Sequence, residues 1–149
     1  MLDTLLNLYN IAENKGITID TINLKKKGVS IKLNNKCYIG LSNKLNGDFE
    51  TRDVLAEELG HCCTNSFYTL NTPLPLLKQN VDKAERQAKD WAIRHILPLP
   101  QLLNSIKNNC GDLYLVAEDF DTNIDYIKDA IDYYTRKNVM PSYNEILAD

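Results

Sequence analysis

The strongest constraint on the fold is a change in the spacing of apolar residues along the chain. Apolar residues recur at helical spacing over residues 3–14, alternate with polar residues over 17–45, and return to helical spacing after Gly47-Asp48. The alternation predicts strands, and Asn34-Asn35 between two alternating runs predicts a hairpin turn. We therefore expect an α+β fold with an N-terminal helix, a small antiparallel sheet of about three strands, and then a helical bundle.

The second half of the chain predicts a series of helices separated by proline or glycine. The expected helices occupy residues 50–64, 77–97, 99–108 and two segments within 112–135. A proline-containing loop, Asn71-Thr72-Pro73-Leu74-Pro75, separates the first two of them. We expect a domain over residues 1–110 and a C-terminal helical section, 111–149, packed on it.

Composition narrows the class of protein. A hydrophobic fraction of 44% in 149 residues is that of an ordinary globular chain. The formal net charge of −3 argues against a nucleic-acid binder with a broad basic surface. The start, Met1-Leu2-Asp3-Thr4, has no basic segment typical of a signal peptide, and no apolar run is long enough to cross a bilayer.

The four cysteines are Cys37, Cys62, Cys63 and Cys110. They form no Cys-x-x-Cys pair, and neighbouring residues on a helix do not converge on one ion. We therefore expect reduced thiols that pack as small apolar side chains, in a cytoplasmic protein.

The stretch Val54-Leu55-Ala56-Glu57-Glu58-Leu59-Gly60-His61 carries the chemistry of the chain. On a helix, Glu57 and His61 project from the same face, because residues four apart lie one above the other. Glu58 is rotated by about 100° from Glu57, so it can address a water beside a metal rather than the metal itself. The pattern is that of a His-Glu-x-x-His zinc helix with its first His replaced by Glu57.

Catalytic zinc sites usually have three protein ligands, and Glu85 is the candidate for the third. On the next helix, Glu85 falls on a face of small apolar residues that includes Ala88 and Ala92. A buried carboxylate needs a cation or strong donors, and a metal shared with the first helix would supply one. A salt bridge from Glu85 to Arg86 or a lysine explains the same pattern equally well.

The chain resembles the ImmA/IrrE-type metallopeptidases of phages, mobile elements and bacterial stress regulators. The resemblance rests on Val54 to His61, then Glu85-x-x-Ala88-x-x-Trp91-Ala92, then Ile96-Leu97-Pro98, and it covers roughly residues 1–135. It implies a zincin-like metal site with the ligands Glu57, His61 and Glu85 and with Glu58 as the catalytic carboxylate. It also implies a protein substrate, typically a helix-turn-helix repressor, whose cleavage or inactivation would derepress phage or mobile-element genes.

Glu57 is a departure from the two-His, one-Glu pattern of many family members. Two carboxylates and a neutral imidazole would formally neutralise a divalent ion, so a bound water would be less acidic than at a two-His site. Oxygen-rich ligation also weakens the preference for Zn²⁺ over Mn²⁺ or Fe²⁺. We expect a divalent metal, with zinc as the first choice.

Three functions are compatible with the sequence. The first is a metalloendopeptidase, in which an edge strand around residues 38–41 would hold an extended peptide. The second is a catalytically degenerate antirepressor or protein-binding module of the same fold. The third is a DNA-binding regulator that uses residues 112–135, but Asp125, Asp129 and Asp132 on its second helix would repel phosphate, so a packing or docking role is the better interpretation.

Overall fold

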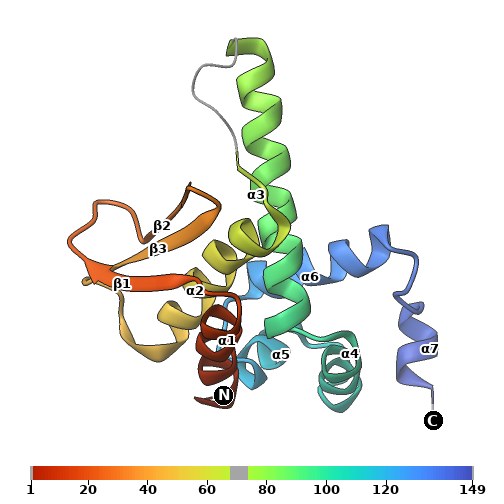
Figure 1. Cartoon of the computed structure of the whole chain (residues 1–149). Helices are drawn as coiled ribbons and strands as arrows, with labels where there is room; N and C mark the ends of the chain where they lie inside the picture. Colours follow the sequence, from red (N-terminus) through yellow and green to blue (C-terminus); the bar gives the residue numbers. More distant parts are fainter. Residues whose placement is uncertain (1, 68–73, 149) are drawn as a thin grey trace. The chain divides into compact units, whose positions relative to one another are not determined.

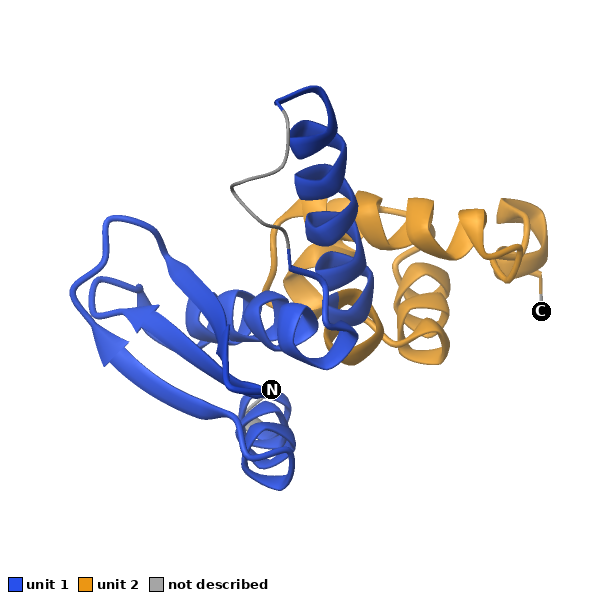
Figure 2. Ribbon diagram, turned by 45° about the horizontal axis from the view of Figure 1, so that its top comes forward, with its two compact units in different colours: residues 1–92 blue, residues 93–149 orange. Residues whose placement is uncertain are grey.

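The computed structural model describes residues 2–67 and 74–148 and divides the chain into two compact units, residues 1–92 and 93–149 (Figure 2). None of the helices in the described ranges is both long and apolar enough to span a membrane. The elements, labelled in Figure 1, are α1 (Leu2–Asn14), β1 (Thr18–Ile22), β2 (Gly28–Leu33), β3 (Lys36–Ser42), α2 (Gly47–Thr64), α3 (Leu74–Ile96), α4 (Leu99–Asn108), α5 (Leu113–Asp119), α6 (Ile124–Arg136) and α7 (Tyr143–Leu147).

The fold class is α+β, with a sheet of three strands in the order β1-β3-β2. The predicted hairpin is present: β2 and β3 are antiparallel, and Asn34 (φ 50°) and Asn35 (φ 63°) both take the left-handed conformation that a tight hairpin turn requires. The expectation of an entirely antiparallel sheet is wrong, because β1 pairs with β3 in parallel. Because β2 occupies one edge of β3, β1 joins the sheet at the other edge. Strand β1 runs in the same direction as β3, so the sheet is mixed.

The expected helices are found close to their predicted ranges, and α2 and α3 each begin three residues earlier than predicted. Of the predicted proline loop, residues 71–73 lie outside the described residues, whereas Leu74 and Pro75 form the first turn of α3. Proline is compatible with a first turn because no helical partner is needed for its missing N–H. The short α7 was not predicted; a capping box between Ser142 and Glu145 starts it.

The first unit is built around α2, which lies against one face of the sheet and also packs on α1 (Figure 1). Its core is apolar and fully or almost fully buried; it includes Leu8, Ala12, Ile39, Leu41, Leu55 and Leu59. Helix α3 meets α2 where Gly60 lies against Ala88. A Cβ added to Gly60 would lie 2.8 Å from the Ala88 Cα, so glycine is required for this close approach of the two helices.

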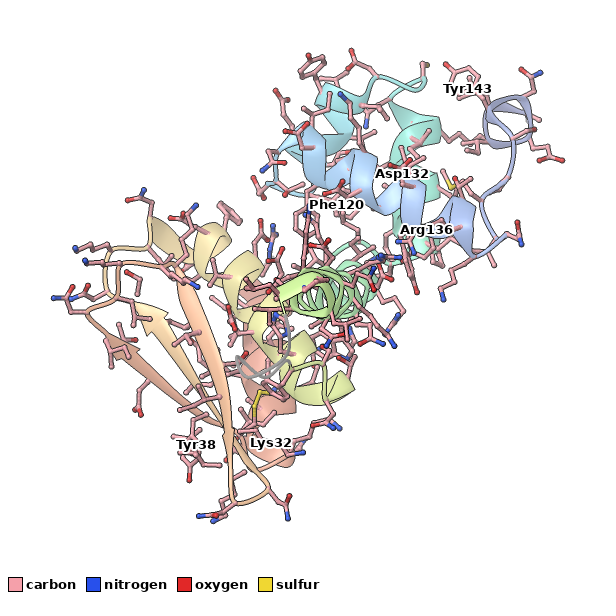
Figure 3. All side chains as sticks on the ribbon, turned by 90° about the horizontal axis from the view of Figure 1, so that it is seen from above. Lys32, Tyr38, Phe120, Asp132, Arg136 and Tyr143 are labelled. Atoms are coloured by element: carbon pink, nitrogen blue, oxygen red, sulfur yellow. A yellow bond between two sulfur atoms is a disulfide. The ribbon has the colours of Figure 1, made fainter. Side chains whose placement is uncertain are left out.

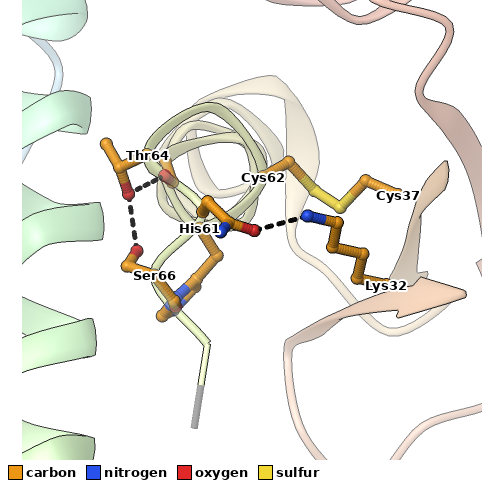
Figure 4. The surroundings of a disulfide bond; sticks show 8 residues. Lys32, Cys37, His61, Cys62, Thr64 and Ser66 are labelled. Atoms are coloured by element: carbon orange, nitrogen blue, oxygen red, sulfur yellow. Dashed lines mark hydrogen bonds between the residues drawn. A yellow bond between two sulfur atoms is a disulfide. The ribbon is translucent and has the colours of Figure 1, made fainter. Parts of the chain in front are cut away.

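A disulfide joins Cys37 of β3 to Cys62 of α2, with the two Cα atoms 5.9 Å apart (Figure 4). The expectation that these two cysteines are reduced and merely pack is therefore wrong. Sequence spacing gave no signal for the pair because Cys62 reaches Cys37 only after α2 folds onto the sheet. Cys63 and Cys110 are free thiols, the first half-buried and the second exposed.

The second unit contains α4 to α7 and its own small core, which includes Leu102, Val116 and Ile127. Two polar side chains cap helices: Asp112 accepts from backbone N–H groups of α5, and Asn123 accepts from one of α6. The division between units falls at Ala92/Ile93 within α3, whereas the boundary expected at 110/111 falls between α4 and α5.

Candidate functional site

The residues singled out in the sequence border one cavity of about 490 Å³ in the first unit. Glu57, Glu58 and His61 come from consecutive turns of α2, Glu85 comes from α3, and β2 forms the facing wall, where Ser30 lies. His61 is buried, and Glu57 and Glu58 are half-buried. The fold therefore brings the four predicted site residues to the same space.

The orientation of His61 is fixed by the end of its own helix. Asn65 is left-handed (φ 52°) and ends α2, and the N–H of Ser66 then bonds back to the His61 carbonyl at 3.0 Å. This turn sets the Ser66 carbonyl oxygen 2.7 Å from His61 Nδ1. A carbonyl oxygen only accepts, so Nδ1 carries the hydrogen, and in the neutral imidazole the lone pair is on Nε2.

His61 Nε2 faces Glu85, with the Oε2 atom of the carboxylate 3.5 Å away. A lone pair and a carboxylate oxygen are both acceptors, so this arrangement is favourable only with a proton or a cation between them. The distance is longer than a hydrogen bond and close to the spacing of about 3.3–3.5 Å between two ligands of one tetrahedral zinc ion. These two atoms thus form a suitable pair of donors for a cation.

Glu85 is more exposed than its sequence neighbours suggested. Ala84 and Ala88 are buried, whereas the Glu85 side chain is 56% exposed at the rim of the cavity. The apolar face of α3 is therefore narrower than expected, and Glu85 lies at its border rather than within it. In the described part of the chain, no three His, Cys, Asp or Glu side chains are grouped closely enough to hold a metal ion as they stand.

Glu57 lies in an environment that disfavours its charge. Burial raises the pKa of this carboxyl, and the nearby negative charges of Glu58, Glu85 and Asp53 raise it further. Lys89 opposes them and lowers it. A bound cation would offset the repulsion between these carboxylates and would stabilise the charged form of Glu57.

Glu58 is similarly perturbed and is held from the opposite wall. Burial raises its pKa, a hydrogen bond with the Ser30 side chain lowers it, and the charges of His61 and Lys26 also lower it. The raising effects are larger, so its carboxyl pKa lies above the ordinary value of 4.5. A carboxylate shifted in this direction is a better general base near neutral pH.

Gly28 of β2 leaves room for Glu58. A Cβ at this position would lie 2.7 Å from Val54 Cγ1, 3.0 Å from Glu58 Cγ and 3.1 Å from Glu58 Oε1. The absence of a side chain at Gly28 thus lets the strand approach the carboxylate, and Ser30, two residues further on, reaches the same group.

Sequence reasoning missed Ser30 and Ser66, both of which act through contacts that only the fold creates. For Ser66 the available signal was Asn65, a residue that tolerates the left-handed conformation after a helix.

The expected peptide-holding edge at residues 38–41 is wrong, because β3 is the central strand and both of its edges are occupied. The sheet edges belong to β1 and β2.

Comparison with known proteins adds no relative: no family model, curated protein or solved structure matches this chain.

Proposed function

We propose that the protein is a metal-dependent endopeptidase with a zincin-like site, in which Glu57, His61 and Glu85 hold a divalent cation and Glu58 is the catalytic carboxylate. The single observation that carries the proposal is the arrangement of His61, whose Nδ1 is bound to a backbone carbonyl while Nε2 faces a carboxylate. Metal-ligating histidines typically have this outer hydrogen bond.

The donor set fits a divalent cation such as Zn²⁺. His61 and Glu85 supply one nitrogen and one oxygen at a suitable spacing, and Glu57 borders the same cavity. The proposal requires the Glu57 carboxylate to turn toward the other two, and a bound cation would relieve the crowding of negative charge around it. When bound, the cation supplies a Lewis acid that acidifies a water and polarises a carbonyl.

Glu58 supplies the proton transfers. Its raised pKa suits removal of a proton from the attacking water and delivery of that proton to the leaving amine. The hydrogen bond from Ser30 holds the carboxylate against β2, at the wall of the cavity. Following the resemblance seen in the sequence, the proposed substrate is a regulatory protein such as a helix-turn-helix repressor.

The proposal is tested by elemental analysis together with a cleavage assay on a defined mixture of unrelated peptides read by mass spectrometry. Wild type and Glu58→Gln are expected to purify with about one metal ion per chain, and Glu85→Ala is expected to lose it. Of these three proteins, only wild type should produce cleaved peptides. Glu13→Ala, which removes an exposed acid on α1, serves as the control.

Three results would contradict the proposal in different ways. Equal, negligible metal in all four proteins would remove the metal site. Stoichiometric metal with no cleavage by wild type would leave a metal-binding module without hydrolytic activity, and equal cleavage by wild type and Glu58→Gln would remove the catalytic role of Glu58.

A further inference from the structure

The face of the sheet that points away from α2 carries an exposed apolar surface. Strand residues alternate between faces, and directly paired residues share one, so Ile31 of β2 lies beside its partner Tyr38 of β3. We call Val29, Ile31, Leu33 and Tyr38 the outer stripe. Ile31 is 49% exposed, Leu33 58% and Tyr38 37%, and Figure 3 shows Tyr38 and Lys32 on opposite sides of the sheet.

The outer stripe borders the open edge of β2. The N–H of Ser42 donates to the Lys27 carbonyl at 2.8 Å, which identifies this pair as hydrogen-bonded. Hydrogen-bonded and non-bonded residues alternate along an antiparallel pair, so Val29 and Ile31 bond to β3. The backbone N–H and C=O groups of Gly28 and Ser30 consequently point away from β3, to an edge with which no other strand pairs among the residues that the structure describes, and another strand can join there.

The same edge runs along the candidate site. Gly28 and Ser30 face α2 and approach Glu58, whereas Val29 and Ile31 belong to the outer stripe on the opposite face. All four residues border the cavity that Glu58 also lines. A strand paired with β2 would therefore present alternate side chains to Glu58 and to the outer stripe.

We propose that the outer stripe selects an extended peptide with apolar residues at alternate positions, bound as a fourth strand along β2. The residues opposite Ile31 and Leu33 cover these side chains, while the residues between them enter the cavity. Cross-strand apolar pairs of this kind stabilise a sheet, and main-chain hydrogen bonds to Gly28 and Ser30 supply affinity that does not depend on sequence. This inference deepens the proposed function and rests on it, since it names the substrate class of the same site.

Charge distinguishes a peptide from a second copy of this chain as the occupant. Lys26 precedes β2 and borders the cavity, and Lys32 and Lys36 lie near its other end. Two β2 edges brought together would collect these lysines in one place, whereas a peptide with acidic residues near its ends would complement them.

The experiment uses Glu58→Gln as the full-length background, so that bound peptide is not consumed, with Zn²⁺ present. The probe is a fluorescent peptide in which Leu or Val alternates with Ser or Thr between acidic ends, and its control has the same composition with the apolar residues grouped together. Binding is followed by fluorescence polarisation. The double change Ile31→Thr/Leu33→Thr removes apolar surface but places β-branched residues, which suit a strand, at both positions. Ile22→Thr is the matched control on β1, at the other edge of the same face.

The alternating peptide should bind at least about tenfold more tightly than the grouped one, and the double change should remove that preference while Ile22→Thr retains it. Equal affinity for both peptides, or equal effects of the double change and Ile22→Thr, would overturn the inference. Loss of a dimer on the double change, seen by light scattering, would assign the stripe to self-association instead.

The proposed endopeptidase function is tested separately, by measuring whether the wild-type protein cleaves the alternating peptide and the grouped peptide. Stripe-dependent binding without cleavage would retain the inference and reject the endopeptidase. Cleavage of both peptides without a preference for the alternating one would retain the endopeptidase and reject the inference about the outer stripe.

Discussion

At the scale of single residues, the candidate site contains two carboxyl groups whose negative charge is disfavoured by their surroundings. Glu57 and Glu58 are neighbours in sequence, both are half-buried, and each lies near further acids. Burial is the main reason why both carboxyl pKa values are raised. Without a cation, such groups lower the stability of the folded protein at neutral pH.

The stability of the chelator-treated protein should therefore depend on the charge of Glu57. A raised carboxyl pKa means that the folded state binds the proton more tightly than the unfolded state, so the stabilisation is complete below about 4.5 and is lost as pH rises through the folded-state value. Glu57→Gln is expected to raise the melting temperature at pH 8 and to give no gain at pH 4, as measured by thermal unfolding in chelator.

Glu13→Gln, at an exposed position on α1, is the control and should change the melting temperature little at either pH. A gain from Glu57→Gln that is equal at both pH values would show that the effect is not one of charge.

At the scale of elements, two glycines set the distances on which the site depends. Gly60 allows α3 to approach α2, and Gly28 allows β2 to approach Glu58. The first approach determines whether His61 and Glu85 meet, since they lie on different helices. The second affects the surroundings of Glu58 and of Val54, one turn earlier on the same helix.

The two glycines therefore give separable predictions. Gly60→Ala should force α3 away from α2, destabilise the protein by about 1–3 kcal/mol from overpacking, less a gain of up to about 1 kcal/mol in helix propensity, and abolish stoichiometric metal binding. Gly28→Ala should displace Glu58 and reduce cleavage while metal content stays unchanged. Urea unfolding and elemental analysis of both variants measure the difference, and retained metal in Gly60→Ala would contradict the role given to this contact.

At the scale of the whole chain, a covalent link adds to the noncovalent core. The Cys37–Cys62 disulfide joins positions 25 residues apart and ties the central strand to α2. Closing a loop of this length restricts the unfolded chain and is worth about 3 kcal/mol.

Reduction should accordingly lower the free energy of unfolding by about 3 kcal/mol in urea titrations with and without reductant. The Cys37→Ser/Cys62→Ser double variant should be equally destabilised and should not respond to reductant. Cys110→Ser, which removes an exposed free thiol, should retain the full response of wild type. An unchanged midpoint on reduction of wild type would exclude a stabilising role for the bond.

The charge of the chain also predicts its behaviour toward DNA. Helices α5 and α6 are present in the expected succession, but α6 carries Asp125, Asp129 and Asp132, and the formal net charge is −3. We expect no binding to duplex DNA in fluorescence anisotropy at low salt. Binding that weakens steeply with added salt would instead support a DNA-reading role.

The sequence was sufficient for the features that depend on local patterns. The helix ranges, the Asn34-Asn35 hairpin and the common face of Glu57 and His61 follow from periodicity and turn chemistry. It was insufficient where the outcome depends on contacts across the fold. The parallel pairing of β1 and the bond between Cys37 and Cys62 each join distant segments, and no pattern along the chain encodes them.

The disulfide has a consequence for assembly of the site. The covalent loop that it closes, from Cys37 to Cys62, contains Glu57, Glu58 and His61 but leaves Glu85 outside. In the oxidised protein, the end of α2 that carries these three groups thus remains tied to the sheet even when tertiary structure loosens, whereas Glu85 returns only with its helix. The metal affinity of the oxidised protein would then decrease in proportion to the fraction of molecules in which α3 has separated from α2.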